Sequence, residues 1–589
     1  MSLLLPCGPS ARFMAAAIAA GLIALAPPGP SLGAPATLPD IPNPKVIKAG
    51  KIGRSGGTLI TGEISDPRTF NSIVAQETSS SVPLGRVFDG LVETNFETTE
   101  VEPALAESWT TSADGRTWTF KLRKGVRFHD GVEFTADDVV FNMEAAFTPG
   151  VQTSRRDVLT TAGKPIKWRK IDAYTVELQT AEPFGAFLRA ITSNILPKHK
   201  LEAALHAGGA DFNKTWGVNT APREIVGTGP FIMQSYVPGE RIVFLRNPRY
   251  WKVDGQGNRL PYLARHVQLI VGNLDALHLK FQAGETDVYV LRPREFAEFK
   301  AREQAGKYTI YEPGPTSGTE FLELNMNPQG IKPPKLAWFS NVKFRQAIAY
   351  AIDRSAVANQ VYGGRAQPQF GPVTPANKTF YNPKVKQYPY DPARAEALLA
   401  EAGFKKAADG ALRDAAGNPV EFTVSTNSEN TDRVALGNVV RQDLTKIGIK
   451  VTLAPEAFNT LVGKLSGSYN WEGVIIGFTG GLDPHTSQNI WRSSGSLHDW
   501  WPKQEKPATP WEAEIDKLFD QAATTLDPNR RKQLYNRWQE IVAEQQPLIY
   551  FVNVKLAVAA RNTLANMSPS AFGGATWNID RIFYTVPFR

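Results

Sequence analysis

The chain has 589 residues, which is more than one compact core normally holds, so two or three subdomains are expected. Hydrophobic residues make up 42% of the sequence and charged residues 21%, and this composition excludes an intrinsically disordered chain. The net charge of +8 is spread along the sequence, with acidic residues between the basic ones. A nucleic-acid binder concentrates its positive charge in one stripe, so we expect a solvated basic surface and no nucleic-acid partner.

The first 36 residues have the layout of a secretory signal peptide. Arg12 precedes an apolar stretch at residues 13–26, a Pro-rich break follows, and residues 34–36 (Ala-Pro-Ala) form a cleavage site of the A-x-A type. The apolar stretch is short for a membrane span. We therefore predict cleavage after Ala36 and an exported protein that acts in the periplasm. The only cysteine, Cys7, would leave with the signal, which excludes disulfides and thiol chemistry from the mature chain.

The next part of the chain predicts a leader and then short strands and helices. Residues 37–56 are rich in Pro, Gly and Lys and are expected to form an extended leader, followed by a strand at Gly57–Gly62. Apolar and polar residues alternate strictly in Thr117–Arg123, which predicts a half-buried strand. Thr135 is expected to cap the following helix, because its hydroxyl can accept a hydrogen bond from a free amide of the first turn.

The clearest unit in the second half of the chain is a βαβ segment. Val420–Ser425 predicts a strand, Thr431–Ile447 a helix and Ile449–Leu453 a second strand. A βαβ segment joins parallel strands, so we expect at least one sheet with a parallel core and helices packed on it.

Two later helices are expected to begin at Asp-Pro pairs, at residues 391–392 and 527–528. Aspartate caps a helix well, and proline fits the first turn because its missing amide has no partner there in any case. After the second of these helices, Leu548–Val554 is expected to be one continuous apolar strand.

The sequence lacks the motifs that mark common enzymes. It contains no HExxH, no nucleotide-binding P-loop and no dinucleotide fingerprint, and its seven histidines never pair at metal-ligand spacing on one helix. Residues 53–57 fit the pattern G-x-S-x-G, but a nucleophile elbow needs a strand before the serine and a helix after it. We therefore predict that the chain is not an enzyme and holds no cofactor or metal. A secreted hydrolase is the alternative from a different class.

Three stretches together resemble the extracellular solute-binding proteins of family 5, the dipeptide-, oligopeptide- and nickel-binding receptors of ABC importers. They are Phe88–Phe147, Gly227–Trp251 and Asn341–Arg354. The resemblance implies an α/β, type II periplasmic-binding fold with two lobes, an extra subdomain in lobe one and a two-strand hinge. It also implies that a ligand binds between the lobes and shifts an open–closed equilibrium, which permease subunits in the cytoplasmic membrane recognise.

The resemblance also divides the chain into domains. The expected boundaries are residues 1–36 for the signal peptide, 37–56 for the leader, 57–312 for lobe one with its extra subdomain at about 83–224, 313–548 for lobe two, and 549–589 for the return to lobe one. The hinge strands are placed near Tyr311–Asn325 and Leu548–Lys555. A monomer is expected.

In similar peptide receptors, a loop rich in glycine, aspartate and aromatic residues carries an aspartate that pairs with the free α-amine of the peptide. The matching loop here is Gly473–Asn489, and the position of that aspartate falls on Gly480 or Gly481. This departure predicts weak binding of simple peptides and better binding of a neutral or N-blocked solute, unless Asp483 or Glu323 turns inward. Asp483 could equally be a turn residue before Pro484.

The candidate ligand-binding residues are of three kinds. The first are residues of the loop, and the second is Glu323, which matches a pocket-facing acidic residue of the oligopeptide receptors. The third are nearby aromatic residues, which belong either to the site or to the core. All the candidates together are Phe321, Glu323, Trp471, Phe478, Thr479, Gly480, Gly481, Asp483 and Trp491. We expect a receptor for peptides or peptide-like solutes. The alternatives with the same fold are an oligosaccharide or opine receptor, which the missing aspartate favours, and a nickel receptor, for which His485 and His498 are the nearby pair.

Overall fold

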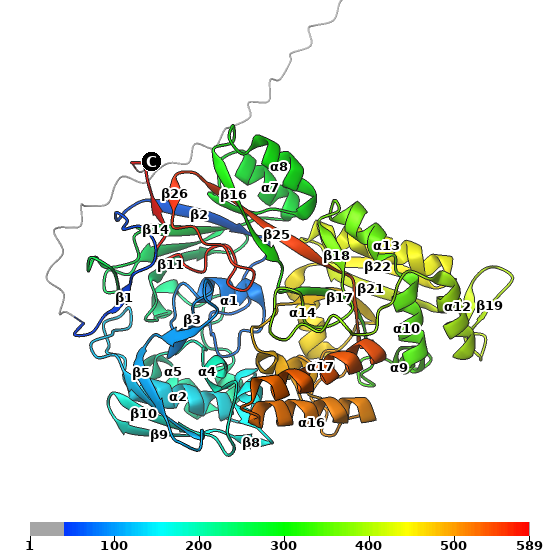
Figure 1. Cartoon of the computed structure of the whole chain (residues 1–589), viewed down its shortest axis with the longest axis horizontal. Helices are drawn as coiled ribbons and strands as arrows, with labels where there is room; N and C mark the ends of the chain where they lie inside the picture. The colour runs from blue at the N-terminus through cyan, green and yellow to red at the C-terminus, as the bar shows by residue number, and fades with distance from the viewer. Residues whose placement is uncertain (1–40, 588–589) are drawn as a thin grey trace, which may run out of the picture. The chain divides into compact units, whose positions relative to one another are not determined.

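The computed structural model describes residues 41–587. The predicted signal peptide and the first residues of the expected leader lie outside this range. Within residues 41–587, no helix combines the length and the apolar character that a membrane span requires. The described chain is mixed α/β, and its main sheets fall into two groups, one in each of two lobes (Figure 1).

The first lobe contains three main sheets. The first has the strand order β11-β12-β14-β2, with bounds Phe231–Val237, Arg241–Arg246, Arg265–Ile270 and Thr58–Glu63. The second has the order β5-β6-β10-β9, with bounds Ala106–Thr111, Thr117–Leu122, Thr175–Gln179 and Lys167–Asp172. The third has the order β15-β25-β16, with bounds Val288–Val290, Val552–Arg561 and Tyr308–Pro315. The predicted strands at Gly57–Gly62 and Thr117–Arg123 are confirmed as β2 and β6.

The helices of this lobe pack beside and between these sheets. They are α1 Thr78–Leu84, α2 Ala136–Phe147, α3 Arg155–Val158, α5 Lys198–Ala207, α7 Leu274–Gln282 and α8 Phe296–Arg302. The predicted cap of α2 is confirmed as a complete capping box. The Asp137 amide donates to the Thr135 hydroxyl at 3.3 Å, and the Thr135 amide donates to the Asp138 carboxylate at 2.9 Å.

The described part of the expected leader is held against the first lobe. Its strand β1 (Lys45–Ile47) pairs in parallel with β13 (Lys252–Asp254). The Lys45 ammonium lies 2.6 Å from Glu93 and 2.9 Å from Glu102. Residues 41–56 of the leader are therefore part of the folded lobe.

The second lobe is built on one five-stranded sheet with the order β22-β21-β23-β17-β24. The bounds of these strands are Lys450–Glu456, Glu421–Asn427, Gly473–Phe478, Thr319–Leu324 and Leu548–Tyr550. Strands β21 and β22 are parallel, with Val424 opposite Leu453, and helix α13 (Thr431–Lys446) connects them. This confirms the predicted βαβ segment.

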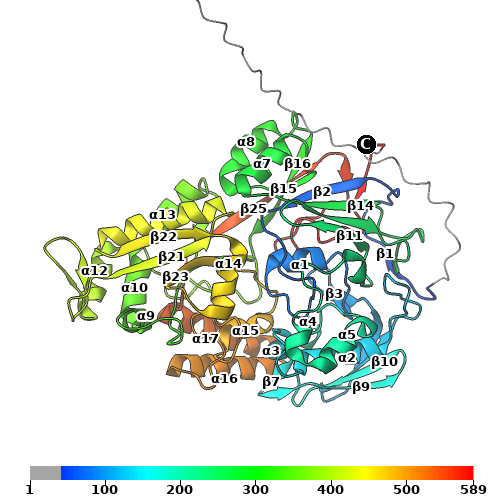
Figure 2. The same cartoon turned by 180° about the vertical axis from the view of Figure 1, so that it is seen from behind.

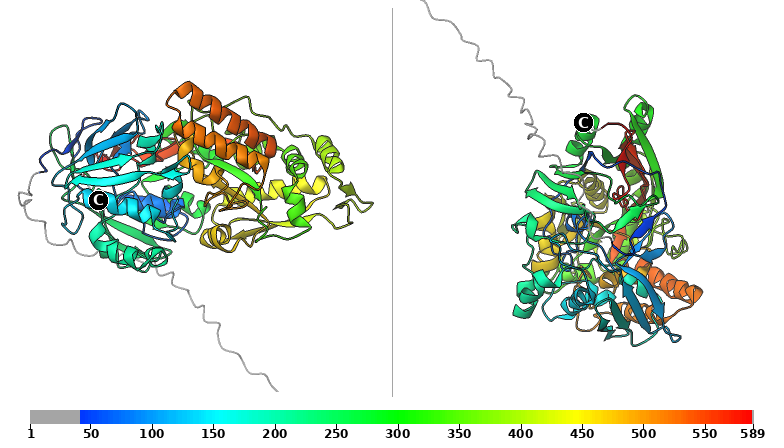
Figure 3. Two further views of the ribbon diagram at one scale, coloured as in Figure 1. Left: turned by 90° about the horizontal axis from the view of Figure 1, so that it is seen from below. Right: turned by 90° about the vertical axis from the view of Figure 1, so that its left-hand side faces the viewer.

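Further helices surround this sheet. They are α10 Val342–Ala351, α12 Pro392–Glu401, α14 Phe458–Gly463, α15 Gln488–Trp491, α16 Pro510–Thr524 and α17 Pro528–Gln545. Asp391 and Asp527 cap α12 and α17 as predicted, since their carboxylates accept from the amides of Arg394 and Arg530 at 2.9 and 2.7 Å. Helices α16 and α17 lie side by side (Figure 3).

The chain passes between the lobes at two places. Residues 316–318 lead from β16 to β17, and Phe551 separates β24 from β25. The prediction of one continuous strand at Leu548–Val554 is therefore wrong. Residues 548–550 pair with β17 and residues 552–554 pair with β18 (Ala366–Pro368), so the hydrogen-bond partner changes at Phe551. From Lys555 onward the chain pairs with β16 and β15 of the first lobe. The two passages have the arrangement of a two-strand hinge.

Candidate ligand-binding site

A cavity of about 1670 Å³ lies between the two lobes. The first lobe contributes the end of β2 at residues 61–64, part of α1 and most of residues 150–157. The second lobe contributes the start of β17, the end of β23 with its following loop at residues 476–481, and several residues between 486 and 503. Pockets for drug-sized ligands measure about 300–1,000 Å³, so this cavity has room for a solute of several linked units.

The predicted loop after β23 forms part of the cavity wall. Phe478, Thr479, Gly480 and Gly481 all line the cavity, and their contact with a ligand stays a prediction. A Cβ atom added at Gly480 would lie 2.0 Å from the carbonyl oxygen of Ser317, and one at Gly481 would lie 2.5 Å from the Thr486 hydroxyl. Glycine is therefore required at position 480, because the hinge backbone runs directly behind it.

Asp483 does not face the cavity. Its carboxylate accepts two hydrogen bonds from the guanidinium of Arg531, at 2.8 and 2.9 Å, and a third from the His485 amide at 3.0 Å. Asp483 and Arg531 are both buried. Asp483 does not line the cavity. Of the two alternatives for Asp483, this arrangement therefore favours the structural residue before Pro484 over a replacement for the missing amine-binding aspartate.

Three other predicted contact residues lie in the core of the second lobe. Phe321 and Trp471 are buried in its hydrophobic core, and Phe321 packs on Phe478 with ring centroids 5.0 Å apart. Glu323, on β17, is fully buried and lies outside the residues that line the cavity. Of the strand β17, only the first residues, Thr319 and Glu320, line the cavity, and Glu323 lies further along the strand in the core.

Trp491 belongs mainly to an aromatic cluster. Its ring centroid lies 5.0 Å from that of Trp538 and 6.0 Å from that of Trp500. It lines only a separate cavity of about 40 Å³ behind the loop at 478–481. Trp491 therefore supports the loop from behind and is not part of the wall of the main cavity.

The two histidines of the nickel alternative are engaged elsewhere. His485 Nε2 lies 2.9 Å from the Val158 carbonyl, and His498 contacts the Ile490 carbonyl at 2.8 Å and Glu512 at 3.1 Å. Neither lines the main cavity. Across residues 41–587, no three side chains among His, Cys, Asp and Glu are grouped so that they could hold a metal ion.

Sequence reasoning missed the carboxylates of the cavity wall, and those whose burial most affects them include Glu63, Asp157 and Asp499. Burial raises the pKa of Glu63 to about 7, against the opposing effect of Arg86. Burial likewise raises the pKa of Asp157 to about 6 and that of Asp499 to about 8. These residues come from separate parts of the chain, and none of them belongs to a motif that a single sequence displays.

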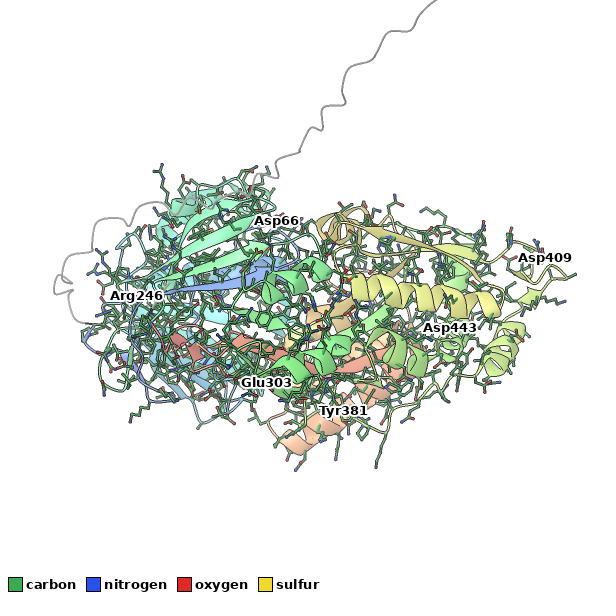
Figure 4. The ribbon with its side chains drawn as sticks, turned by 90° about the horizontal axis from the view of Figure 1, so that it is seen from above. Asp66, Arg246, Glu303, Tyr381, Asp409 and Asp443 are labelled. Carbon is green, nitrogen blue, oxygen red and sulfur yellow. The ribbon has the colours of Figure 1, made fainter. Side chains whose placement is uncertain are left out.

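Contacts between the lobes border the cavity. The side-chain amide of Asn459, on α14, donates to the Asp66 carbonyl at 3.3 Å, and Figure 4 labels Asp66. Helix α15 lies beside α3 (Figure 2). Near the hinge, Arg294 lies 3.4 Å from Asp432 at the start of α13. The structure thus has the two lobes in contact around the cavity.

Two lobes joined by a two-strand hinge, with a large cavity between them, define a receptor that encloses a solute. The chain belongs to the bacterial extracellular solute-binding proteins, family 5, whose middle region matches residues 100–498. The members of this family are binding proteins and not enzymes.

Among similar proteins is a probable ABC transporter-binding protein of Deinococcus radiodurans, 32% identical over 84% of this chain and 86% of its own length. The dipeptide-binding protein of Escherichia coli (strain K12) is 29% identical over 82% of this chain and 86% of its own.

Two solved structures have the same fold. The oligopeptide-binding protein AppA from Bacillus subtilis, in complex with a nonapeptide, matches with a TM-score of 0.78 and 24% identity over 91% of this chain and all of its own. MelB from Agrobacterium fabrum, in complex with stachyose, matches with a TM-score of 0.79 and 22% identity over 91% of this chain and 86% of its own.

Proposed function

We propose that the chain is the solute-capturing component of an ABC importer and that its solutes are peptides or peptide-like molecules. The cavity of about 1670 Å³ with walls from both lobes carries this proposal, because a solute held there contacts both lobes at once. Such a ligand stabilises the closed arrangement by its differential contacts, and the permease subunits recognise that arrangement. The named relatives include peptide-binding proteins, which supports the choice of solute.

In this proposal, lobe one comprises residues 57–315 and 555–589 and lobe two comprises residues 316–554. The boundaries expected at residues 313 and 549 move because β16 pairs within lobe one and β24 pairs within lobe two. The protein acts in the periplasm as a monomer and neither makes nor breaks a bond in its solute. An oligosaccharide or opine is the second candidate solute. The structure of MelB with stachyose supports it, since that protein has the same fold.

The identity of the solute is tested by mass spectrometry of ligand released from protein purified from the periplasm. Peptides of several residues are the expected result. A single oligosaccharide species with no peptide would contradict the choice of peptides and support the second candidate.

Ligand binding is expected to bring the lobes together and to raise stability. Small-angle scattering of ligand-free protein should give a larger radius of gyration than the same protein saturated with the solute identified above. At a concentration about 100 times the dissociation constant, the ligand should add about 2.7 kcal/mol to the free energy of unfolding. An unchanged radius at saturation would show that the cavity does not close on its ligand.

The export signal gives a further prediction. N-terminal sequencing of the protein from the periplasmic fraction should begin at Thr37, because residues 34–36 form the cleavage site. Recovery of the exported protein with residues 1–30 attached would overturn the signal-peptide prediction.

A further inference from the structure

The cations in the wall of the cavity already have partners or lie at the surface. Arg433 donates to Glu320 at 2.9 Å, Arg86 to the Thr576 carbonyl at 2.9 Å, and Arg156 to the Ala146 carbonyl at 3.1 Å. Arg292 is paired with Glu295 and Asp275. The other cations of the wall are exposed to solvent, and they are Arg68, Lys503 and Lys555. The wall therefore presents no buried, unengaged cation within the described part of the chain.

One carboxylate of the wall is buried and has an oxygen without a hydrogen-bond partner. Asp499 is 5% exposed, and its Oδ1 atom has no hydrogen-bond partner. No cationic side chain within residues 41–587 forms an ion pair with it. A buried carboxylate without a partner costs several kcal/mol of desolvation, and such groups occur mainly where a ligand or a reaction needs them.

A second carboxylate stands behind it. Glu323 is fully buried, and neither of its carboxylate oxygens has a hydrogen-bond partner of ordinary geometry, although the Trp500 amide lies beside it. Its pKa is raised well above the ordinary value, first by burial and then by the negative charge of Asp499. The Met326 amide, two residues beyond the end of β17, donates to the Trp500 carbonyl at 2.8 Å, so the segment that carries Asp499 packs beside the strand that carries Glu323. Of the two carboxyl groups, only Asp499 lines the cavity.

We propose that Asp499, with Glu323 behind it, is the subsite that binds a primary ammonium group of the solute, such as the N-terminal ammonium of a peptide. This inference rests on the proposed function and specifies which end of the solute this part of the wall recognises. An ammonium group supplies the positive charge and the N–H donors that the pair lacks. Asp499 shares the wall with the loop at 478–481, whose glycines provide no carboxylate. The proposal thus reverses the expectation, drawn from those glycines, that an N-blocked solute binds better.

The test compares two pools of peptides on ligand-free mature protein. Equimolar pools of tripeptides to hexapeptides are prepared with free amino termini and with N-acetylated termini, and the retained peptides are quantified by mass spectrometry. The wild-type protein should retain the free-amine pool at least tenfold better. Asp499→Asn should reduce this preference to within twofold, because it keeps the shape of the side chain and removes its charge.

Asp409→Asn is the matched control, since Asp409 is an exposed carboxylate of the second lobe that does not line the cavity. It should keep the preference of the wild-type protein. Equal retention of the two pools by the wild-type protein would overturn the subsite and leave the proposed function intact. A preference that survives in Asp499→Asn, or that is lost in Asp409→Asn, would also overturn the subsite. Retention of neither pool would instead refute the choice of peptides as solutes, and with it the subsite. A single cooperative thermal transition for each variant would show that the variants fold.

Discussion

Replacing Arg531 by methionine is expected to lower the free energy of unfolding by about 3–5 kcal/mol. The side chains of Arg531 and Asp483 are only 8% and 6% exposed, and the guanidinium makes two hydrogen bonds to the carboxylate. Removing one member of such a pair leaves the other buried and charged without compensation. Urea denaturation followed by tryptophan fluorescence measures the change.

An exposed ion pair of the same lobe provides the control. Arg413 lies 3.1 Å from Asp409, which Figure 4 labels, and these side chains are 39% and 57% exposed. Exposed ion pairs contribute little to the free energy of unfolding, so Arg413→Met should change it by no more than about 0.5 kcal/mol. If Arg531→Met lowered the free energy of unfolding no more than Arg413→Met does, the buried carboxylate of Asp483 would not need Arg531 as its partner. Asp483 would then return as a candidate for ligand contact.

Local sequence signals predicted the elements of the fold well. Thr135, Asp391 and Asp527 cap helices where they were expected, because a cap depends only on the few residues around it. The βαβ segment at residues 421–456 was also visible, since its two strands and its helix have different apolar periods. The break at Phe551 could not be predicted, because an apolar run does not show that its two halves pair with different sheets.

The candidate site was predicted only in part, for a related reason. The loop at 478–481 could be located from its glycines, and it does line the cavity. The roles of Asp483 and Glu323 could not be predicted, because each depends on a partner far away in the sequence. Arg531 neutralises Asp483, and Asp499 lies next to Glu323. A single sequence does not reveal which charged residues meet in the folded chain.

Asp499→Asn is expected to stabilise the ligand-free protein at high pH and to have much less effect near pH 4. In the folded chain, burial raises the pKa of Asp499 to about 8, whereas an unfolded aspartate titrates at about 3.9. The folded state therefore binds more protons between these two values, so the contribution of Asp499 to stability falls as the pH rises through this window and stays constant above it. The groups that face this carboxyl are Glu323 on β17 and, beyond it, Tyr550 on β24.

The measurement is the free energy of unfolding of the wild-type protein and of Asp499→Asn at pH 5 and at pH 8.5. One unit of pKa shift corresponds to about 1.4 kcal/mol, so the gain from the substitution should be larger at pH 8.5 by at least that amount. Asp409→Asn is the control. Hydrogen bonds from the Ala411 amide and the Arg413 side chain lower the pKa of this exposed carboxyl, so its removal should give no gain with rising pH. Parallel pH curves for wild type and Asp499→Asn would contradict the raised pKa.

The same experiment with peptide present distinguishes two roles for Asp499. Either Asp499 is a buried residue that only lowers the stability of the fold, or it is a residue that binds the ligand. If Asp499 holds an ammonium group, a saturating free-amine peptide compensates its charge, and the peptide should recover for the wild-type protein the stability that it loses between pH 5 and pH 7, where a peptide α-amine is still protonated. The Asp499→Asn variant has no charge to compensate at this position, so the peptide should stabilise that variant less, and by an amount that is nearly independent of pH. Equal stabilisation of both proteins at pH 7 would mean that Asp499 weakens the fold without binding the ligand.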